Sequence, residues 1–230
     1  MIEARTFLTV VRPTLATGDA HGLARAVAER WTQAEVTSLL RHDDADARRA
    51  AALVLGLVGD NGVTGPLARA LHDADAQVHQ MAEHALWSIW FRGCGCAGVE
   101  CFERGTDLMG QEQYDEAIRA FSQALAQCPE FAEAYNQRAM AHFFAGHYER
   151  SAADCRRAMK LMPAHFGAAA GLGHCLCHLG DYAGALDAYR KALAINPRMP
   201  GIRSAADRLE AKLARPSPSG SPAKSRTSSN

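Results

Sequence analysis

The sequence predicts an all-α protein, an α-α superhelix (solenoid) of helical repeats, and three observations carry that prediction. Pro129, Pro163 and Pro197 are spaced 34 residues apart, and residues between them repeat at the same spacing. A second pattern begins at Asp44 and recurs 31 residues later at Asp75. Apolar residues at helical spacing then continue through residues 202–213. Repeats of these lengths are typical of stacked helix pairs, because each pair buries its apolar face only against its neighbours.

The first block, residues 1–97, is expected to contain short helix pairs. The segment DADARRAAALVL, which starts at Asp44, matches DAQVHQMAEHAL, which starts at Asp75, and each aspartate suits a helix N-cap. Thr32 and Glu35 form a capping-box pattern that opens an earlier helix. A short helix, an Asp-rich turn and a long Ala/Leu-rich helix resemble the HEAT-like repeat. Because stacks usually need three or more units, the segment before Trp31, including residues 20–30, is expected to add helices.

The second block, residues 98–213, is expected to contain three longer copies (98–131, 132–165 and 166–199) and a C-terminal cap helix. Small residues and tyrosines recur at fixed places, Gly146 and Gly180 suit turns between helices, and proline ends each copy. This pattern resembles the tetratricopeptide repeat. Residues 214–230 are rich in Ser and Pro and are expected to form a disordered tail. The two blocks together resemble bacterial HEAT-like/tetratricopeptide proteins of uncharacterised function, which implies an interaction protein.

Composition and charge limit the partners and the compartment. Lys+Arg and Asp+Glu are both 25, so the net charge is zero, which argues against a nucleic-acid partner. No apolar stretch approaches the roughly 20 residues that a membrane-spanning helix needs, and no signal peptide is recognised, so no membrane partner is expected. Seven cysteines without an export signal favour a reduced, cytoplasmic protein with free thiols.

No catalytic motif is found, and the chain is expected to be non-enzymatic, without cofactor or metal. Two clusters keep an alternative open, a metal- or thiol-dependent enzyme. The first is Cys94, Cys96 and Cys101; the second is His174, Cys177 and His178, which share one helix face. Neither spacing matches a closed metal site, and cysteine also packs as a small hydrophobe. A self-associating structural scaffold is a further alternative.

The strongest functional prediction is a groove that binds a peptide or helix of a partner protein. The resemblance implies that the first helix of each tetratricopeptide pair lines a concave surface. The residues expected to line it are Phe102, Thr106, Met109, Asn136, Gln137, Met140, Phe143, Phe144, Ala170, His174, Cys177 and His178. Methionine adapts to varied apolar partners, and amide side chains can satisfy a peptide backbone. The predicted function is therefore a protein–protein interaction adaptor.

Two further predictions follow from particular residues. One subclass of the family grips the acidic C-terminus of chaperones with a cationic carboxylate clamp. The matching positions here are Phe102, Thr106, Gln137, Gly167 and Gly171. None of them is cationic, so the sequence predicts that no chaperone carboxylate-clamp ligand is bound. The aromatic residues Trp87, Trp90 and Phe91, at helical spacing, are expected to pack between the blocks and not to form a ligand cage.

Overall fold

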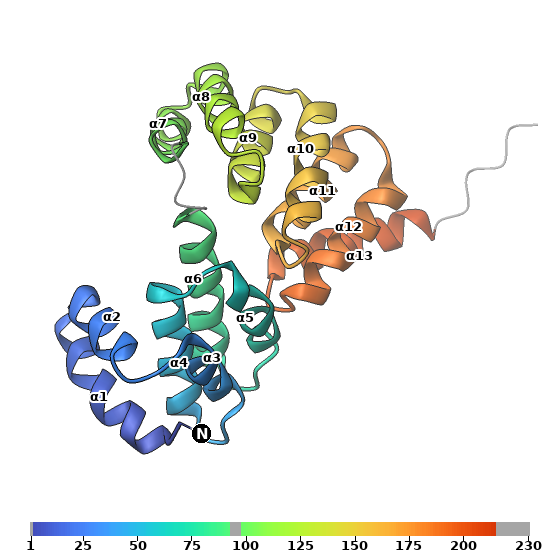
Figure 1. Ribbon diagram of the computed structural model, residues 1–230. Helices are drawn as coiled ribbons and strands as arrows, with labels where there is room; N and C mark the ends of the chain where they lie inside the picture. The colour runs from blue at the N-terminus through green and yellow to red at the C-terminus, as the bar shows by residue number, and fades with distance from the viewer. Residues whose placement is uncertain (1, 93–97, 215–230) are drawn as a thin grey trace, which may run out of the picture.

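The computed structural model describes residues 2–92 and 98–214, and these residues form helices and no strand (Figure 1). The first block contains α1 (Ala4–Thr17), α2 (Ala20–Ala28), α3 (Gln33–Ser38), α4 (Ala45–Val58), α5 (Thr64–Ala70) and α6 (Ala76–Arg92). Two short 3-10 turns, η1 (Leu39–Arg41) and η2 (Asn61–Val63), accompany α3 and α5. The predicted all-α solenoid is confirmed. The predicted block boundary at 97/98 lies at the edge of residues 93–97, which are outside the described ranges. Nearly all of the expected tail also lies outside them.

Capping residues set the starts of the helices in the first block. Thr32 and Glu35 make the reciprocal capping box that the sequence predicts. The Asp44 carboxylate accepts from the Asp46 N–H at 2.9 Å, and the Asp75 carboxylate accepts from the Val78 N–H at 3.0 Å. Each carboxylate satisfies an N–H that has no partner within the helix, so both predicted N-caps are confirmed. The HEAT-like nature of this block stays a prediction.

The long helices α4 and α6 form the centre of the first block. A Cβ placed on Gly56 would lie 2.9 Å from the Ala85 Cα atom, so the glycine permits the close approach of the two helices. The predicted extra helices are present as α1 and α2, and their buried Phe7, Val11 and Leu23 join the same core. One continuous apolar core therefore runs through the block.

The second block is an arc of helix pairs closed by a last helix (Figure 1). Its elements are α7 (Val99–Gly110), α8 (Tyr114–Gln127), α9 (Ala132–Phe144), α10 (Tyr148–Leu161), α11 (Phe166–His178), α12 (Tyr182–Ile195) and α13 (Pro200–Leu213). The helices α8, α10 and α12 each end two residues before the repeating proline, which cannot supply a backbone N–H to continue them. The helix α13 is the predicted cap.

The turn between the helices of each pair requires one residue with left-handed backbone. Gly146 and Gly180 adopt φ angles of 79° and 80°, as their conformational freedom allows. The equivalent residue of the first copy is Glu112, with a φ of 59°. A side chain with a Cβ is strained in this region, so the first copy has a less favourable turn than the other two.

Cys101, Cys155, Cys175 and Cys177 are free thiols, whereas Cys128 is disulfide-bonded, so the expectation of a fully reduced chain fails at that residue. Within residues 2–92 and 98–214, no helix combines the length and the apolar character needed to cross a membrane.

We predict that Glu112→Gly stabilises the second block. The substitution removes the Cβ strain at φ 59°, which is worth about 1 kcal/mol of free energy of unfolding. Urea denaturation followed by circular dichroism measures the change. Gly180→Ala serves as the opposite control, because it introduces the same strain at φ 80° and is expected to destabilise. A Glu112→Gly variant that is less stable than wild type would contradict this explanation.

Candidate partner-binding groove

A hollow of about 270 Å³ lies between α9 and α11, on the side of the arc that faces α6. Residues of α6, α9, α10 and α11 line it. Its lining residues are Trp87, Asn136, Ala139, Met140, Phe143, Phe144, Ser151, Cys155, Gly167, Ala170, Gly171 and His174. Ser151 and Cys155 come from α10, behind the two lining helices, and form the floor. The lining is almost entirely apolar and includes no lysine, arginine, aspartate or glutamate.

Small residues on α11 open this hollow. Gly167, Ala170 and Gly171 stand where the preceding copy has Glu133, Asn136 and Gln137, which carry much larger side chains. A Cβ on Gly171 would lie 3.2 Å from the Cys155 sulfur, so the floor is reached directly past the α11 backbone. The sequence of α11 therefore leaves a space between helices that side chains fill elsewhere in the array.

Large apolar side chains surround the opening. Met140 is 41% exposed and Phe144 is 55% exposed. Both belong to α9, whose opposite residues are buried in the core. The Phe144 ring stacks on Tyr114 with centroids 5.3 Å apart, and Phe143 packs edge-on against Tyr148 at 5.4 Å. These ring contacts hold the aromatic rim in place while leaving apolar surface exposed to solvent.

A buried polar network fixes the start of α11 beside α6. Glu133 is 1% exposed and His165 is fully buried. The His165 Nδ1 accepts from the Ala168 N–H at 3.2 Å and caps α11, so its Nε2 carries the proton and donates to the Glu133 Oε2 at 2.7 Å. The other Glu133 oxygen accepts from the side-chain amides of Asn136 and Gln137 at 3.2 and 2.6 Å.

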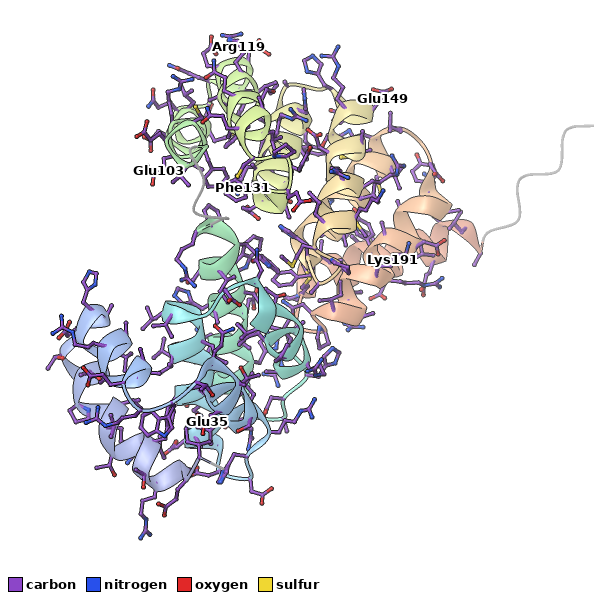
Figure 2. All side chains as sticks on the ribbon, viewed as in Figure 1. Glu35, Glu103, Arg119, Phe131, Glu149 and Lys191 are labelled. Atoms are coloured by element: carbon purple, nitrogen blue, oxygen red, sulfur yellow. The ribbon has the colours of Figure 1, made fainter. Side chains whose placement is uncertain are left out.

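Aromatic rings of α6 seal this network. The Trp90 indole stacks on the His165 ring with centroids 4.3 Å apart and an interplanar angle of 13°. Both Trp90 and Trp87 also pack against Phe166, at 5.3 and 5.4 Å. The prediction that these tryptophans pack between the blocks is confirmed, whereas Phe91 stays 42% exposed. Phe166 of α11 belongs to the same buried apolar cluster as the core of the first block, so the two blocks meet through a packed junction, toward which side chains of both blocks extend (Figure 2).

The titratable groups at the hollow favour uncharged forms. Partial desolvation, with a smaller contribution from His178, lowers the pKa of His174. A hydrogen bond with Cys175, together with burial, raises the pKa of the Cys155 thiol. Both groups are therefore neutral near pH 7. An ionised side chain entering the hollow would find no opposite charge among its lining residues.

The structure brings together six of the predicted groove residues: Asn136, Met140, Phe143, Phe144, Ala170 and His174. Ala170 lies between Gly167 and Gly171 of α11. These residues come from the second and third copies only. Their role in binding a partner stays a prediction.

The other predicted residues lie outside the hollow. Phe102 is only 3% exposed and packs on Phe131 with centroids 4.6 Å apart, so its ring faces the core and not the groove. Gln137 is also buried, where it donates to Glu133. Thr106 donates to the Glu103 carbonyl oxygen, and Met109 packs on the core of the first copy.

The third-copy cluster has local partners of its own. The Tyr189 hydroxyl lies 2.8 Å from His174 Nδ1 and 3.7 Å from the Cys177 sulfur, while His178 stacks on Tyr148 at 4.3 Å. In the part of the chain that the structure describes, no three His, Cys, Asp or Glu side chains are grouped to hold a metal. Cys94 and Cys96 lie outside the described residues.

Sequence reasoning missed several lining residues. Trp87 was assigned to the interior between the blocks, yet it is half-buried and also forms one wall of the hollow. Ser151 and Cys155 come from the second helix of a pair, which the groove prediction did not include. The sequence feature that indicates the hollow is the run GAAAG at 167–171. Its small side chains allow Ser151 and Cys155 of α10 to line the hollow.

Comparison with known proteins supports this description of the second block. The tetratricopeptide repeat family matches residues 102–161 and again residues 168–199, so this part of the chain consists of tetratricopeptide repeats. A "TPR repeat-containing protein" of Rhizobium etli is 30% identical over 121 residues, which is 52% of this chain and 59% of that protein. The Hsp70-Hsp90 organizing protein 1 of Glycine max is 26% identical over 114 residues, 48% of this chain and 20% of that protein. The chain thus spans three fifths or less of these relatives.

Solved structures share the fold of the same region. The first tetratricopeptide domain of Spaghetti (RPAP3), bound to the HSP90 peptide SRMEEVD, is 22% identical with a TM-score of 0.50, and the match covers 51% of this chain and 94% of that one. The Arabidopsis OM64 tetratricopeptide domain is 23% identical with a TM-score of 0.50, covering 50% and 96%. These likenesses establish the arrangement of the helices.

The predicted exclusion of chaperone carboxylate-clamp ligands is wrong. It rested on the lack of cations at Phe102, Thr106, Gln137, Gly167 and Gly171. The similar proteins nevertheless include a chaperone organizing protein and a domain bound to an HSP90 peptide. An extended peptide also gains affinity from main-chain hydrogen bonds and from pockets for its apolar side chains. Missing cations remove one contribution to affinity and do not exclude the class of ligand.

We predict that Glu133→Gln destabilises the protein by about 2 kcal/mol, because it replaces a buried acceptor of three hydrogen bonds with a group that must also donate. Urea denaturation measures the loss. The control is Glu116→Gln, which alters an exposed ion pair with Arg119 and should leave the free energy of unfolding nearly unchanged. Equal effects of the two substitutions would show that the buried network has no special role.

Proposed function

We propose that this protein is a non-enzymatic interaction adaptor that holds a segment of a partner protein against the helices α9 and α11. The observation that carries the proposal is the apolar hollow whose rim is formed by the exposed Met140 and Phe144 and the half-buried Phe143. Exposed apolar surface costs free energy in water, and burial against a partner recovers it. Tetratricopeptide repeats supply the rigid array that presents this surface.

The partner is proposed to be a protein, and chaperone C-terminal peptides stand among the candidates. A similar fold holds the peptide SRMEEVD, which contains methionine and valine as well as acidic residues. In the present chain, apolar side chains of such a segment would enter the hollow, while acidic ones would remain in solvent or meet cations outside it. The proposed mode of action is recruitment, in which the second block binds one protein and the remaining surface is free for another.

The test begins with a random peptide library displayed on phage and selected against the full chain. The recovered peptides and synthetic SRMEEVD are then titrated calorimetrically against wild type and two variants. We predict that Met140→Glu weakens binding of the recovered peptides about ten-fold or more, because it places an unpaired charge at the apolar opening.

The matched control for this experiment is Leu57→Glu. Leu57 is 39% exposed and lies on α4, outside the hollow, whereas Met140 is 41% exposed at its rim. Both substitutions add the same charge at a similarly exposed apolar position. Affinity that falls equally in both variants, or in neither, would count against the groove as the binding surface.

A further inference from the structure

The hollow is a composite of both blocks, because one wall comes from α6. A Cβ on Gly167 would lie 2.7 Å from the Trp87 Cη2 atom, so the indole edge rests directly on the first turn of α11. Trp90 and Phe166 also pack against Trp87, with ring centroids 5.0 and 5.4 Å away. The wall is therefore set by the packed junction and does not depend on a ligand to position it.

Gly171 has no structural requirement comparable to that of its neighbour Gly173. A Cβ on Gly173 would lie 2.4 Å from the Tyr189 ring, so the helices α11 and α12 cannot approach with any larger residue there. At Gly171 the nearest atom is the Cys155 sulfur at 3.2 Å, so a Cβ would fit after a shift of that sulfur by a few tenths of an ångström, and the backbone is not left-handed. A glycine inside a helix costs about 0.5–1 kcal/mol relative to alanine. Its main effect here is to keep the hollow open.

The chemistry of the lining selects an uncharged, apolar occupant. Among the residues that the structure describes, no charged side chain lines the space, and the pKa shifts keep His174 and Cys155 neutral. Asn136 donates its amide to Glu133, and none of the described residues donates to its Oδ1, which leaves that oxygen available to a backbone N–H. A volume of about 270 Å³ lies just below the roughly 300–1,000 Å³ of pockets that hold a small-molecule ligand. It suits a single large side chain.

We propose that the hollow is a socket for one large uncharged apolar side chain (leucine, isoleucine, methionine or phenylalanine) in a segment of the partner protein, with Trp87 of the first block as its wall. The anchor side chain lies between Trp87, Phe143 and Gly171, and the backbone N–H beside it donates to Asn136. Residues of the partner on either side of the anchor, charged or not, lie outside the socket. This inference rests on the proposed function and adds the residue class that the partner must supply.

The test fills the socket by a substitution in its own lining. Gly171→Leu places a side chain in the space that the anchor would occupy, while removing a glycine from the middle of α11. The probes are the phage-selected peptides, each in its original form and with its shared apolar position changed to alanine. We expect Gly171→Leu to weaken binding of the original peptide about ten-fold or more. Its melting temperature is measured alongside, because the new Cβ requires the Cys155 sulfur to shift by a few tenths of an ångström. The alanine peptide should bind weakly to both proteins, so the two changes together should cost little more than either alone.

Two further variants keep the result interpretable. Gly201→Leu is the matched control, because a Cβ at this helical glycine of α13 meets no atom within 4 Å and lies far from the hollow in sequence. It should leave affinity unchanged. Trp87→Ala removes the wall without filling the space, and it should weaken binding of the original peptide more than binding of the alanine peptide. This variant also tests the socket if Gly171→Leu fails to fold.

The outcomes separate this inference from the proposed function. Loss of binding in Met140→Glu with full binding in Gly171→Leu and Trp87→Ala would overturn the socket and leave the groove in place. Full binding in all three variants would overturn both. Selected peptides that share no apolar position, or that share a charged one, would also overturn the socket.

Discussion

The buried hydrogen bond between His165 and Glu133 is the interaction on which the start of α11, the part of the array that packs against the first block, depends. It joins the start of α11 to the first turn of α9, and the Trp90 ring of α6 covers it. A buried carboxylate is costly unless its acceptors are satisfied, and Glu133 meets that condition with three donors from two helices. The hydrogen bonds fix α11 against α9, and the His165 ring that they hold in place is the surface on which Trp90 of α6 stacks.

The position of Trp87 follows from that docking. Trp90 faces the network, and Trp87, one turn earlier on α6, faces the space beside it. A tetratricopeptide array without this N-terminal block would lack this wall. In the present chain the wall, the missing side chains of Gly167 and Gly171 and the rim of α9 enclose one apolar space. The first block thus helps to shape the site as well as to extend the solenoid.

Much of the fold could be predicted from periodicity, because spacing alone fixes which residues share a helix face. The prolines gave the ends of α8, α10 and α12, and Asp44, Asp75 and Thr32 gave helix starts. The site was harder to predict, since it depends on how helices from different blocks meet. Phe102 lies on a predicted lining helix, yet it turns into the core; Trp87 lies in the first block, yet it reaches the groove. The wrong exclusion of chaperone ligands came from treating five side chains as the whole of peptide recognition.

The most direct test of this account is the ¹⁵N nuclear magnetic resonance spectrum of the tryptophan indole groups during titration with a selected peptide. The chain has three tryptophans, and Trp31, packed on Phe7 in the first block, serves as an internal reference. Single Trp→Phe variants assign the signals. The account predicts a saturable shift of the Trp87 signal with the Trp31 signal unchanged. A peptide that binds while the Trp87 signal stays in place would contradict a socket built from both blocks.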